Sequence, residues 1–474
     1  MLFNSIEYLL FLPVVFILYW SLNSRLTLQN FLLLFASYFF YGWWDWRFLS
    51  LIIFSSTIDY VIGLIIHDSI CLKKKKAWLI ASISTNLLLL SIFKYFNFFI
   101  ESFESMFSAI GWQPNHVTLN IILPIGISFY TFQTMSYSID IYRNKIEPSR
   151  SILTFFTYVA FFPQLVAGPI ERASNLIPQL SQKRRIHIDD FKAGIFQIII
   201  GLFRKIVIAD SLGVYVDVIY QNPGAYNSST VFLATLFYAF QIYFDFAGYS
   251  DIAIGTARLL GFKFERNFNL PYFSTSLTEF WRKWHISLST WLRDYLYISL
   301  GGNRINKIFT YRNLMLTMLL GGLWHGSSWN FVIWGGIHGL VLSLEKGLTK
   351  YFVFFQKYIA LGKVLGWIYT FTIVLIAWIF FRANNFTLAI EAFLKLLEFD
   401  FSAPYINDIQ VQTNAIVVLL IGILFDIYLF KKGMNLESLG SYFSLVKFVF
   451  LTSIVITLMA LFHSTSLNFI YFQF

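Results

Sequence analysis

Long apolar segments alternate with short polar ones along almost all of the 474 residues. A helix needs about 17–25 apolar residues to cross the hydrocarbon core of a bilayer, and about a dozen segments here approach that length. They lie near 5–21, 28–42, 46–67, 77–99, 119–139, 151–170, 192–209, 230–256, 313–345, 365–382, 412–430 and 445–464. The segment 313–345 is long enough for two passes or one bent pass. The pattern predicts an all-α polytopic membrane protein.

The composition supports a membrane protein throughout. Apolar residues make up 57% of the chain and charged residues 13%, against about 45–50% and 25% in soluble domains. Pro163, Gly168 and Pro169 interrupt the segment 151–170, which predicts a broken or re-entrant pass. The single cysteine, Cys71, excludes an internal disulfide and a cysteine-based metal cluster.

The positive charges gather in three loops rather than in one domain. The Lys73–Lys76 run and the loops 171–192 and 257–312 carry most of the positive charge of a chain whose net charge is +10. The positive-inside rule places all three in the cytoplasm, with the amino terminus outside. Since these charges lie between apolar segments, binding to anionic lipid headgroups explains them better than binding to nucleic acid. We therefore expect contact with membrane lipid and no nucleic-acid partner.

The basic segment 257–312 is the longest stretch that does not form a simple pass. It holds nine Lys and Arg residues against three acids, with several Trp and Tyr between them. Such a mixture is typical of a helix that lies on the membrane surface or packs under a bundle. A second interpretation is a site for a phosphate-bearing cytosolic donor, gripped by guanidinium groups. His285 lies in the middle of this segment.

Two histidines lie inside the uncharged stretch LLGGLWHGSSWNFVIWGGIHGL (319–340). An imidazole there is costly, so His325 and His338 are functional candidates by default, although each can simply bond a neighbouring helix. The glycines beside His325 favour a functional role, because they allow backbone or substrate to approach closely. On one helix the two histidines would lie about 220° apart at about 100° per residue. They share no face unless the helix breaks, and without an HxxxH or HExxH motif we expect no metal site.

Four carboxylates, Asp59, Asp140, Asp245 and Asp251, lie in or beside apolar segments. Each is a candidate partner for an imidazole or a group that packs helices together. A structural role is favoured for all except Asp245, which follows the aromatic run QIYF and remains a candidate orienting group. The chain has no GxSxG motif, which leaves histidine as the main candidate for acid–base chemistry.

Two histidine motifs carry a resemblance to a known family. FWRKWHISLSTWLRDYLYISLGGNR (280–304) and GGLWHGSSWNFVIWGGIHG (321–339) resemble the membrane-bound O-acyltransferases, and more narrowly their bacterial branch of alginate O-acetylases and teichoic-acid D-alanyl transferases. The likeness to the alginate O-acetylase subgroup continues through AFFPQLVAGPIER (160–172), FRKIVIADSLGVYVD (203–217), FDFAGYSDIAIG (244–255) and the closing FIYFQF (469–474).

The resemblance implies one multi-pass membrane domain over 1–474, in the cytoplasmic (inner) membrane of a bacterium. Roughly 11–12 tilted helices would form a ring around a thin centre, with a funnel from each face and interfacial helices. Within it we expect N-terminal passes (1–256), the basic interfacial segment (257–312), a pass with the catalytic histidine (313–345) and C-terminal passes (365–474). By resemblance His325 is the catalytic residue and His285 lines the same passage.

The expected reaction is an O-acetyl transfer. Acetyl would pass from cytosolic acetyl-coenzyme A, as substrate, across the membrane toward an exported, alginate-like polysaccharide, and relatives imply a periplasmic esterase-like acetyltransferase as partner. We expect Arg282 and Arg293, near His285, to bind the donor phosphates. Two alternatives remain open: a proton-coupled transporter or flippase that uses His325 and Asp245, and a lipid O-acyltransferase with a lateral lipid entrance.

Overall fold

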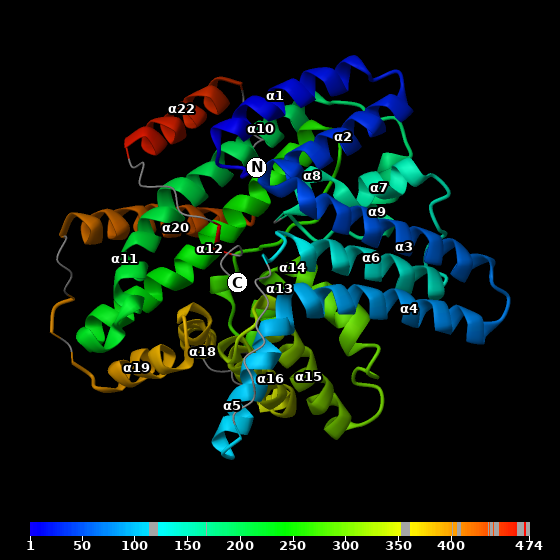
Figure 1. Ribbon diagram of the computed structural model, residues 1–474. Coiled ribbons are helices and arrows are strands. Elements are labelled where there is room, and N and C mark those ends of the chain that lie inside the picture. Colours follow the sequence, from blue (N-terminus) through cyan, green and yellow to red (C-terminus); the bar gives the residue numbers. More distant parts are fainter. Residues whose placement is uncertain are drawn as a thin grey trace. The chain divides into compact units, whose positions relative to one another are not determined.

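The computed structural model describes residues 1–112, 122–166, 168–351, 361–400, 402–404, 409–434, 436, 439, 445–461 and 469–470. In these ranges the secondary structure is helical (Figure 1). The helices divide into two compact units. The first unit comprises residues 1–187 and 256–264, and the second comprises 188–255 and 265–474.

The first unit is built from eleven helical segments in the described ranges. They are α1 (Ile6–Ser21), α2 (Leu26–Asp45), η1 (Trp46–Phe48), α3 (Leu49–Asp68), α4 (Leu72–Leu90), η2 (Ser91–Tyr95), α5 (Phe96–Ala109), α6 (Ile127–Tyr142), α7 (Ile152–Ala160), α8 (Phe162–Leu165) and α9 (Ala173–Leu180). The predicted interruption near Pro163 is confirmed, because α7 ends at Ala160 and α8 is only four residues long.

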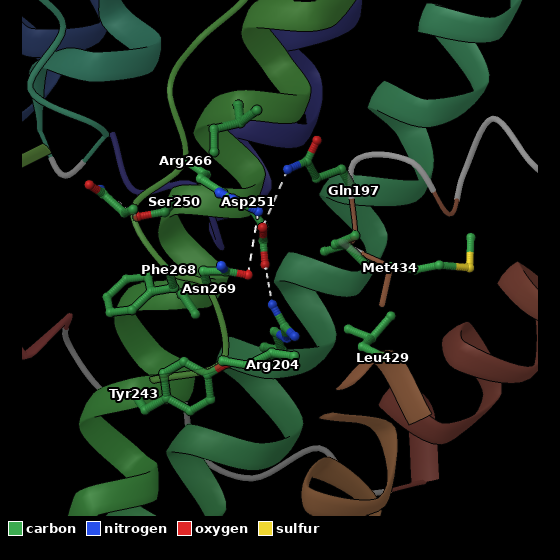
Figure 2. A pocket seen from close by; sticks show the side chains of 15 residues that line it. Gln197, Arg204, Tyr243, Ser250, Asp251, Arg266, Phe268, Asn269, Leu429 and Met434 are labelled. Carbon is green, nitrogen blue, oxygen red and sulfur yellow. Dashed lines mark hydrogen bonds and ion pairs between the residues drawn. The ribbon is translucent and has the colours of Figure 1, made fainter. Parts of the chain in front are cut away.

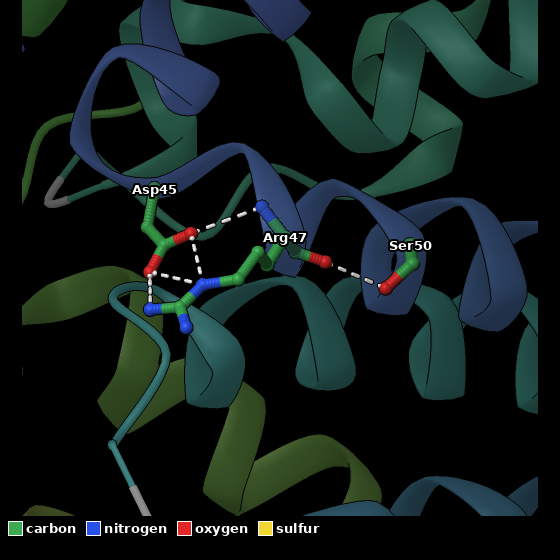
Figure 3. Close-up of polar contacts among 3 residues, drawn as sticks. All are labelled: Asp45, Arg47 and Ser50. Carbon is green, nitrogen blue, oxygen red and sulfur yellow. Dashed lines mark hydrogen bonds and ion pairs between the residues drawn. The ribbon is translucent and has the colours of Figure 1, made fainter.

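Polar side chains fix two points of this unit. Between α2 and α3, the Asp45 carboxylate accepts from the backbone N–H of Arg47 at 3.0 Å and also pairs with its guanidinium (Figure 3). In the interior, the Asp59 carboxylate of α3 accepts from Asn86 of α4 at 2.7 Å and from Ser138 of α6 at 3.0 Å. Interhelical bonds of this kind hold membrane helices together, so Asp59 has the structural role favoured by the sequence.

The second unit contains the remaining helices. They are α10 (Ile188–Leu202), η3 (Phe203–Ala209), α11 (Asp210–Gln221), η4 (Pro223–Ala225), α12 (Ser228–Leu259, to residue 255 in this unit), η5 (Pro271–Phe273), α13 (Leu277–Lys283), α14 (Ile286–Trp291), η6 (Leu292–Tyr297), α15 (Lys307–His325), α16 (Trp329–Gly347), α18 (Gly362–Arg382), α19 (Phe386–Leu397), α20 (Ile409–Lys432) and α22 (Leu445–Leu461).

The length and the apolar composition of the helices agree with a polytopic membrane protein. Among the described residues, five helical stretches are long and apolar enough to cross a bilayer: Leu26–Asp68, Leu72–Ala109, Ser228–Leu259, Gly362–Arg382 and Gln410–Lys432. The predicted segment 313–345 forms two helices, α15 and α16, rather than one bent pass. Parts of the predicted passes 119–139 and 445–464, and most of FIYFQF, lie outside the described residues.

The basic segment 257–312 is packed into the interior over much of its length. Phe280, Trp284 and Leu288 are buried, and the ring of Trp284 lies 5.1 Å from that of Trp378 in α18. This arrangement agrees with the interpretation of helices packed under a bundle. It differs from a helix that only lies on the membrane surface, because such a helix would leave one face open to water.

Candidate active site

His325 is the last residue of α15, at the point where the chain turns into α16. Gly326 is extended, and the hydroxyl of Ser328 caps α16 by accepting from the backbone N–H of Asn330 at 3.3 Å. Ser is a favoured N-cap residue because its oxygen satisfies an N–H that lacks a partner within the helix. The WHGSSWN sequence therefore encodes a helix end, a three-residue turn and a helix start.

Two glycines let α15 and α16 meet closely at this turn. A Cβ added to Gly322 would collide with the backbone carbonyl of Phe331, and a Cβ added to Gly326 would collide with the Phe331 ring. The glycines beside His325 thus allow the backbone and the ring of Phe331 to pack closely against α15 and the turn. The sequence predicted a close approach here, and the structure identifies Phe331 as the group that makes it.

His285 lies between two short helices, in an unusual backbone conformation. Its φ of 41° and ψ of 57° are left-handed, where α13 has ended at Lys283 and α14 begins at Ile286. A residue other than glycine is costly there and persists only where its surroundings impose the conformation. Residues in this state are found disproportionately at active sites.

The loop before α13 holds this junction in place. The backbone carbonyl of Asn267 accepts from the N–H of Ile286 at 2.9 Å, and its side-chain oxygen accepts from Ser287 Oγ at 2.6 Å. The N–H of Asn269 donates to the carbonyl of Lys283 at 3.0 Å. Hydrogen bonds therefore fix the chain on both sides of His285.

The structure brings His285 and His325 together. Their ring centroids lie 6.4 Å apart, and Trp324 contacts both rings. Phe246 packs against His285 at 4.5 Å, while Trp334 and Phe381 pack against His325 at 5.1 and 5.3 Å. His285 is fully buried and His325 is 4% exposed. Two imidazoles thus share a pocket of aromatic rings that largely excludes water.

Burial decides the charge of His285. The loss of hydration lowers the pKa of this imidazole to about 3, because a low-dielectric environment disfavours the charged form. His285 is therefore neutral near pH 7. A neutral imidazole offers one N–H donor and one acceptor nitrogen.

His338 joins the same aromatic group because the helix breaks between the two histidines. Its ring lies 4.8 Å from that of Trp334, which also contacts His325. Trp281 Nε1 donates to His338 Nδ1 at 3.4 Å. Since an indole N–H only donates, Nδ1 is the acceptor and Nε2 carries the proton. The turn at residues 326–328 removes the angular separation expected on a continuous helix.

Arg282 and Arg293 line one cleft beside α14. The cleft has a volume of about 430 Å³, and its walls include Ile286, Ser289 and a third cation, Lys346. Arg293 pairs with Asp294 through Nε at 2.6 Å, and this hydrogen bond raises the pKa of its guanidinium. Within the described ranges, Arg282 and Lys346 form no ion pair. The cleft is therefore cationic and close to His285 in the chain.

The structure does not bring Asp245 to a histidine. Its carboxylate pairs with Lys205 Nζ at 3.0 Å and accepts the backbone N–H of Ile470 at 2.8 Å. Lys205 also bonds Asp210 at 2.7 Å. Asp245 thus belongs to a buried ion network rather than orienting His285 or His325.

This network is the main polar feature that the sequence interpretation missed. Next to Lys205, the guanidinium of Arg204 binds Asp251 at 2.6 Å and Asp426 at 3.1 Å. A small polar cavity of about 50 Å³ lies beside Arg204 and Asp251, with Gln197 bonded to Asp251 at 3.3 Å (Figure 2). The available signal was the Arg-Lys pair inside the apolar run FRKIVIA, since adjacent cations in such a run need partners.

The described residues contain no group of three His, Cys, Asp or Glu side chains placed to hold a metal ion.

The amino-acid sequence is similar to those of known proteins. The family model of the membrane-bound O-acyltransferases matches residues 143–383, which include both histidine motifs. The chain is 42% identical over 424 residues to a protein named probable alginate O-acetylase AlgI from Azotobacter vinelandii, covering 89% of this chain and 83% of the relative. It is 37% identical over 431 residues to the peptidoglycan O-acetyltransferase of Helicobacter pylori, covering 84% and 79%.

A more distant similarity links the chain to a teichoic acid D-alanyltransferase of Bacillus subtilis, with 28% identity over 255 residues, 50% of this chain and 64% of that protein. The matched region, the identity over most of the chain and the apolar helices agree with one another. The chain belongs to the membrane-bound O-acyltransferase family and is a multi-pass membrane acyltransferase.

Proposed function

We propose that this protein is an O-acetyltransferase that passes acetyl from cytosolic acetyl-coenzyme A toward a hydroxyl group of an exported polysaccharide. The names of the relatives, alginate O-acetylase and peptidoglycan O-acetyltransferase, support acetyl as the group and a polysaccharide as the acceptor class. The positive loops support a location in the bacterial cytoplasmic membrane with access to cytosolic donor.

The observation that carries the proposal is the pair of buried imidazoles of His285 and His325, 6.4 Å apart in an aromatic pocket. An acceptor hydroxyl attacks the thioester carbonyl, and His325 takes the proton of that hydroxyl as the C–O bond forms. The C–S bond then breaks, and the imidazolium returns the proton to the leaving thiolate. An imidazole shielded from water can take the proton in the first step and return it in the second.

His285 has a different role in this proposal. Its low pKa keeps it neutral, so its N–H is suited to donate a hydrogen bond to the thioester carbonyl as negative charge develops there. The left-handed backbone at His285 and the hydrogen bonds of Asn267 support a fixed ring position. A fixed donor stabilises the transition state without having to reorient during the reaction.

The cationic cleft beside α14 is the proposed donor site. Arg282, Arg293 and Lys346 line it, and guanidinium groups bind phosphates through paired N–H donors. Because Arg293 is already engaged by Asp294, we assign the larger share of phosphate binding to Arg282. The relatives leave open whether acetyl reaches the polysaccharide directly, and we propose a periplasmic esterase-like acetyltransferase as the partner that completes the transfer.

The acyl transfer is tested by His325→Ala in cells that lack the native gene. We expect O-acetylation of the exported glycan to fall by about 10²–10⁴-fold, while the amount of protein in the membrane is unchanged. The exposed His67 gives the matched control, since His67→Ala should keep wild-type acetylation. Wild-type acetylation by His325→Ala would refute the mechanism.

The donor site is tested with purified protein and radiolabelled acetyl-coenzyme A. Arg282→Ala should raise the KM for the donor more than Arg293→Ala does, with little change in kcat, because it removes binding made equally in the ground and transition states. An unchanged KM in both variants would refute the assignment of this cleft, and transfer from another acyl carrier alone would refute acetyl-coenzyme A as donor.

A further inference from the structure

A second cleft in the same unit is apolar and lies between helices able to cross the membrane. It has a volume of about 530 Å³ and is lined by residues of α12, α18, α20 and η5. The helices α12, α18 and α20 are all long and apolar enough to span a bilayer. The cleft is therefore lined largely by helices that can cross a bilayer.

The cleft has an open apolar wall and a lysine in its lining. Val364 and Trp367 of α18 are 50% and 41% exposed, and Phe430 of α20 is 52% exposed. Lys363, at the first turn of α18, also lines the cleft and forms no ion pair within the described ranges. Lys431 and Lys432 directly follow Phe430 at the end of α20 and are exposed. The other charged residue of the lining, Asp426, is already bound by the Arg204 guanidinium at 3.1 Å, which leaves Lys363 as the cation of the groove, with Lys431 and Lys432 next to its lining residue Phe430 in the chain.

The length of the groove agrees with that of a lipid acyl chain in one leaflet. From Lys363 to Phe371 the wall follows α18 for about 12 Å, at 1.5 Å per residue. One leaflet of the hydrocarbon core is about 15 Å thick. A groove that starts at a lysine and continues for about 12 Å beside apolar side chains therefore fits within a single leaflet, with the cations at the level of the phosphates. The positive-inside rule makes this the cytoplasmic leaflet.

We propose that this groove binds an anionic phospholipid, with one acyl chain between α12, α18 and α20 and the phosphate beside Lys363, Lys431 and Lys432. A hydrocarbon chain complements the apolar walls, and a negative headgroup complements the lysines. The groove is separate from the donor cleft, and Tyr272 stands between it and the aromatic pocket. The Tyr272 ring lies 5.9 Å from that of Trp284, the residue before His285.

The proposal is tested with the purified full chain in vesicles that contain phosphatidylglycerol with a photoreactive group on one acyl chain. Cross-linked peptides, identified by mass spectrometry, should come from residues 363–371 and 423–430. Val364→Trp fills the mouth of the groove and should abolish this labelling. The control is Ile368→Trp on the same helix, because Ile368 is 47% exposed but does not line the groove.

The headgroup preference is tested by competition with unlabelled phosphatidylglycerol or phosphatidylcholine. Lys363→Ala should weaken the preference for phosphatidylglycerol about fivefold, as expected for one lysine near an anionic surface, whereas Lys447→Ala on α22 should not. Labelling spread evenly over the exposed helices, labelling unchanged in Val364→Trp, or equal competition by the two lipids would each overturn the proposal. None of these measurements depends on acetyl transfer.

Discussion

The side-chain oxygen of Asn267 accepts a hydrogen bond from Ser287 Oγ at 2.6 Å, which ties the loop before α13 to the first turn of α14. The Asn267 amide also donates to Ser250 Oγ of α12 at 3.0 Å. His285 lies two residues before Ser287, in a left-handed conformation. Asn267 therefore links the chain around His285 to α12.

We predict that Asn267→Ala lowers kcat by about 10²-fold with a small change in the donor KM, since a misplacement of about 1 Å at a reacting group has that effect. The matched control is Asn269→Ala on the same loop, whose side chain makes only a 3.4 Å contact with Arg266 and whose backbone bond to Lys283 is kept. Steady-state kinetics measure both variants. A wild-type kcat for Asn267→Ala, in a protein that still requires His285, would disprove the positioning role and leave the proposed function intact.

The buried neutral His285 should make stability depend on pH. Its pKa is about 3 in the folded protein and about 6.5 when unfolded, so the unfolded state binds more protons between these values. The stabilisation is complete above pH 6.5 and is lost as the pH falls toward 3. Between pH 7.5 and 5 the expected loss is about 2 kcal/mol.

Thermal unfolding of the detergent-purified protein measures this loss. His285→Gln has no titrating ring, so its melting temperature should fall less between pH 7.5 and 5 than that of the wild type. An equal fall in both proteins would show that other groups carry the dependence.

The contacts of Gly322 and Gly326 with Phe331 predict different responses when Phe331 is replaced by a smaller side chain. Each Gly→Ala change should destabilise the protein by about 1–3 kcal/mol, because an added methyl group overpacks the turn. Phe331→Leu should relieve Gly326→Ala, whose methyl group meets the ring. It should not relieve Gly322→Ala, whose methyl group meets the backbone carbonyl. A double-mutant cycle on melting data distinguishes them, and equal coupling for both pairs would contradict this geometry.

Lys205 balances two buried carboxylates, Asp210 and Asp245. Lys205→Met should destabilise the protein by about 3–5 kcal/mol, because it leaves buried charge without its cation. Adding Asp245→Asn to the Lys205→Met variant should restore part of the lost stability. The control is Lys192→Met, since the pair of Lys192 with the exposed Asp189 should contribute less than about 1 kcal/mol. Similar melting temperatures for Lys205→Met and Lys192→Met would contradict the buried network.

Much of the helix content was determined by the sequence alone. The runs 230–256, 365–382 and 412–430 predicted α12, α18 and α20 to within a few residues, because each helix that crosses lipid must be apolar over a fixed length. The two histidine motifs likewise indicated the family, since their residues are contiguous and carry a recognisable order.

The contacts between side chains followed from the packing of the helices and could not be predicted from the sequence. Helical periodicity treats the chain as continuous, so it separated His325 from His338, whereas the turn at 326–328 places both against Trp334. The same limit applies to Asp245, whose partner Lys205 lies forty positions earlier on another helix. The left-handed backbone of His285 depends on Asn267, from a separate loop. Local preferences operate within a few residues, whereas these contacts depend on packing between distant segments, which no local pattern records.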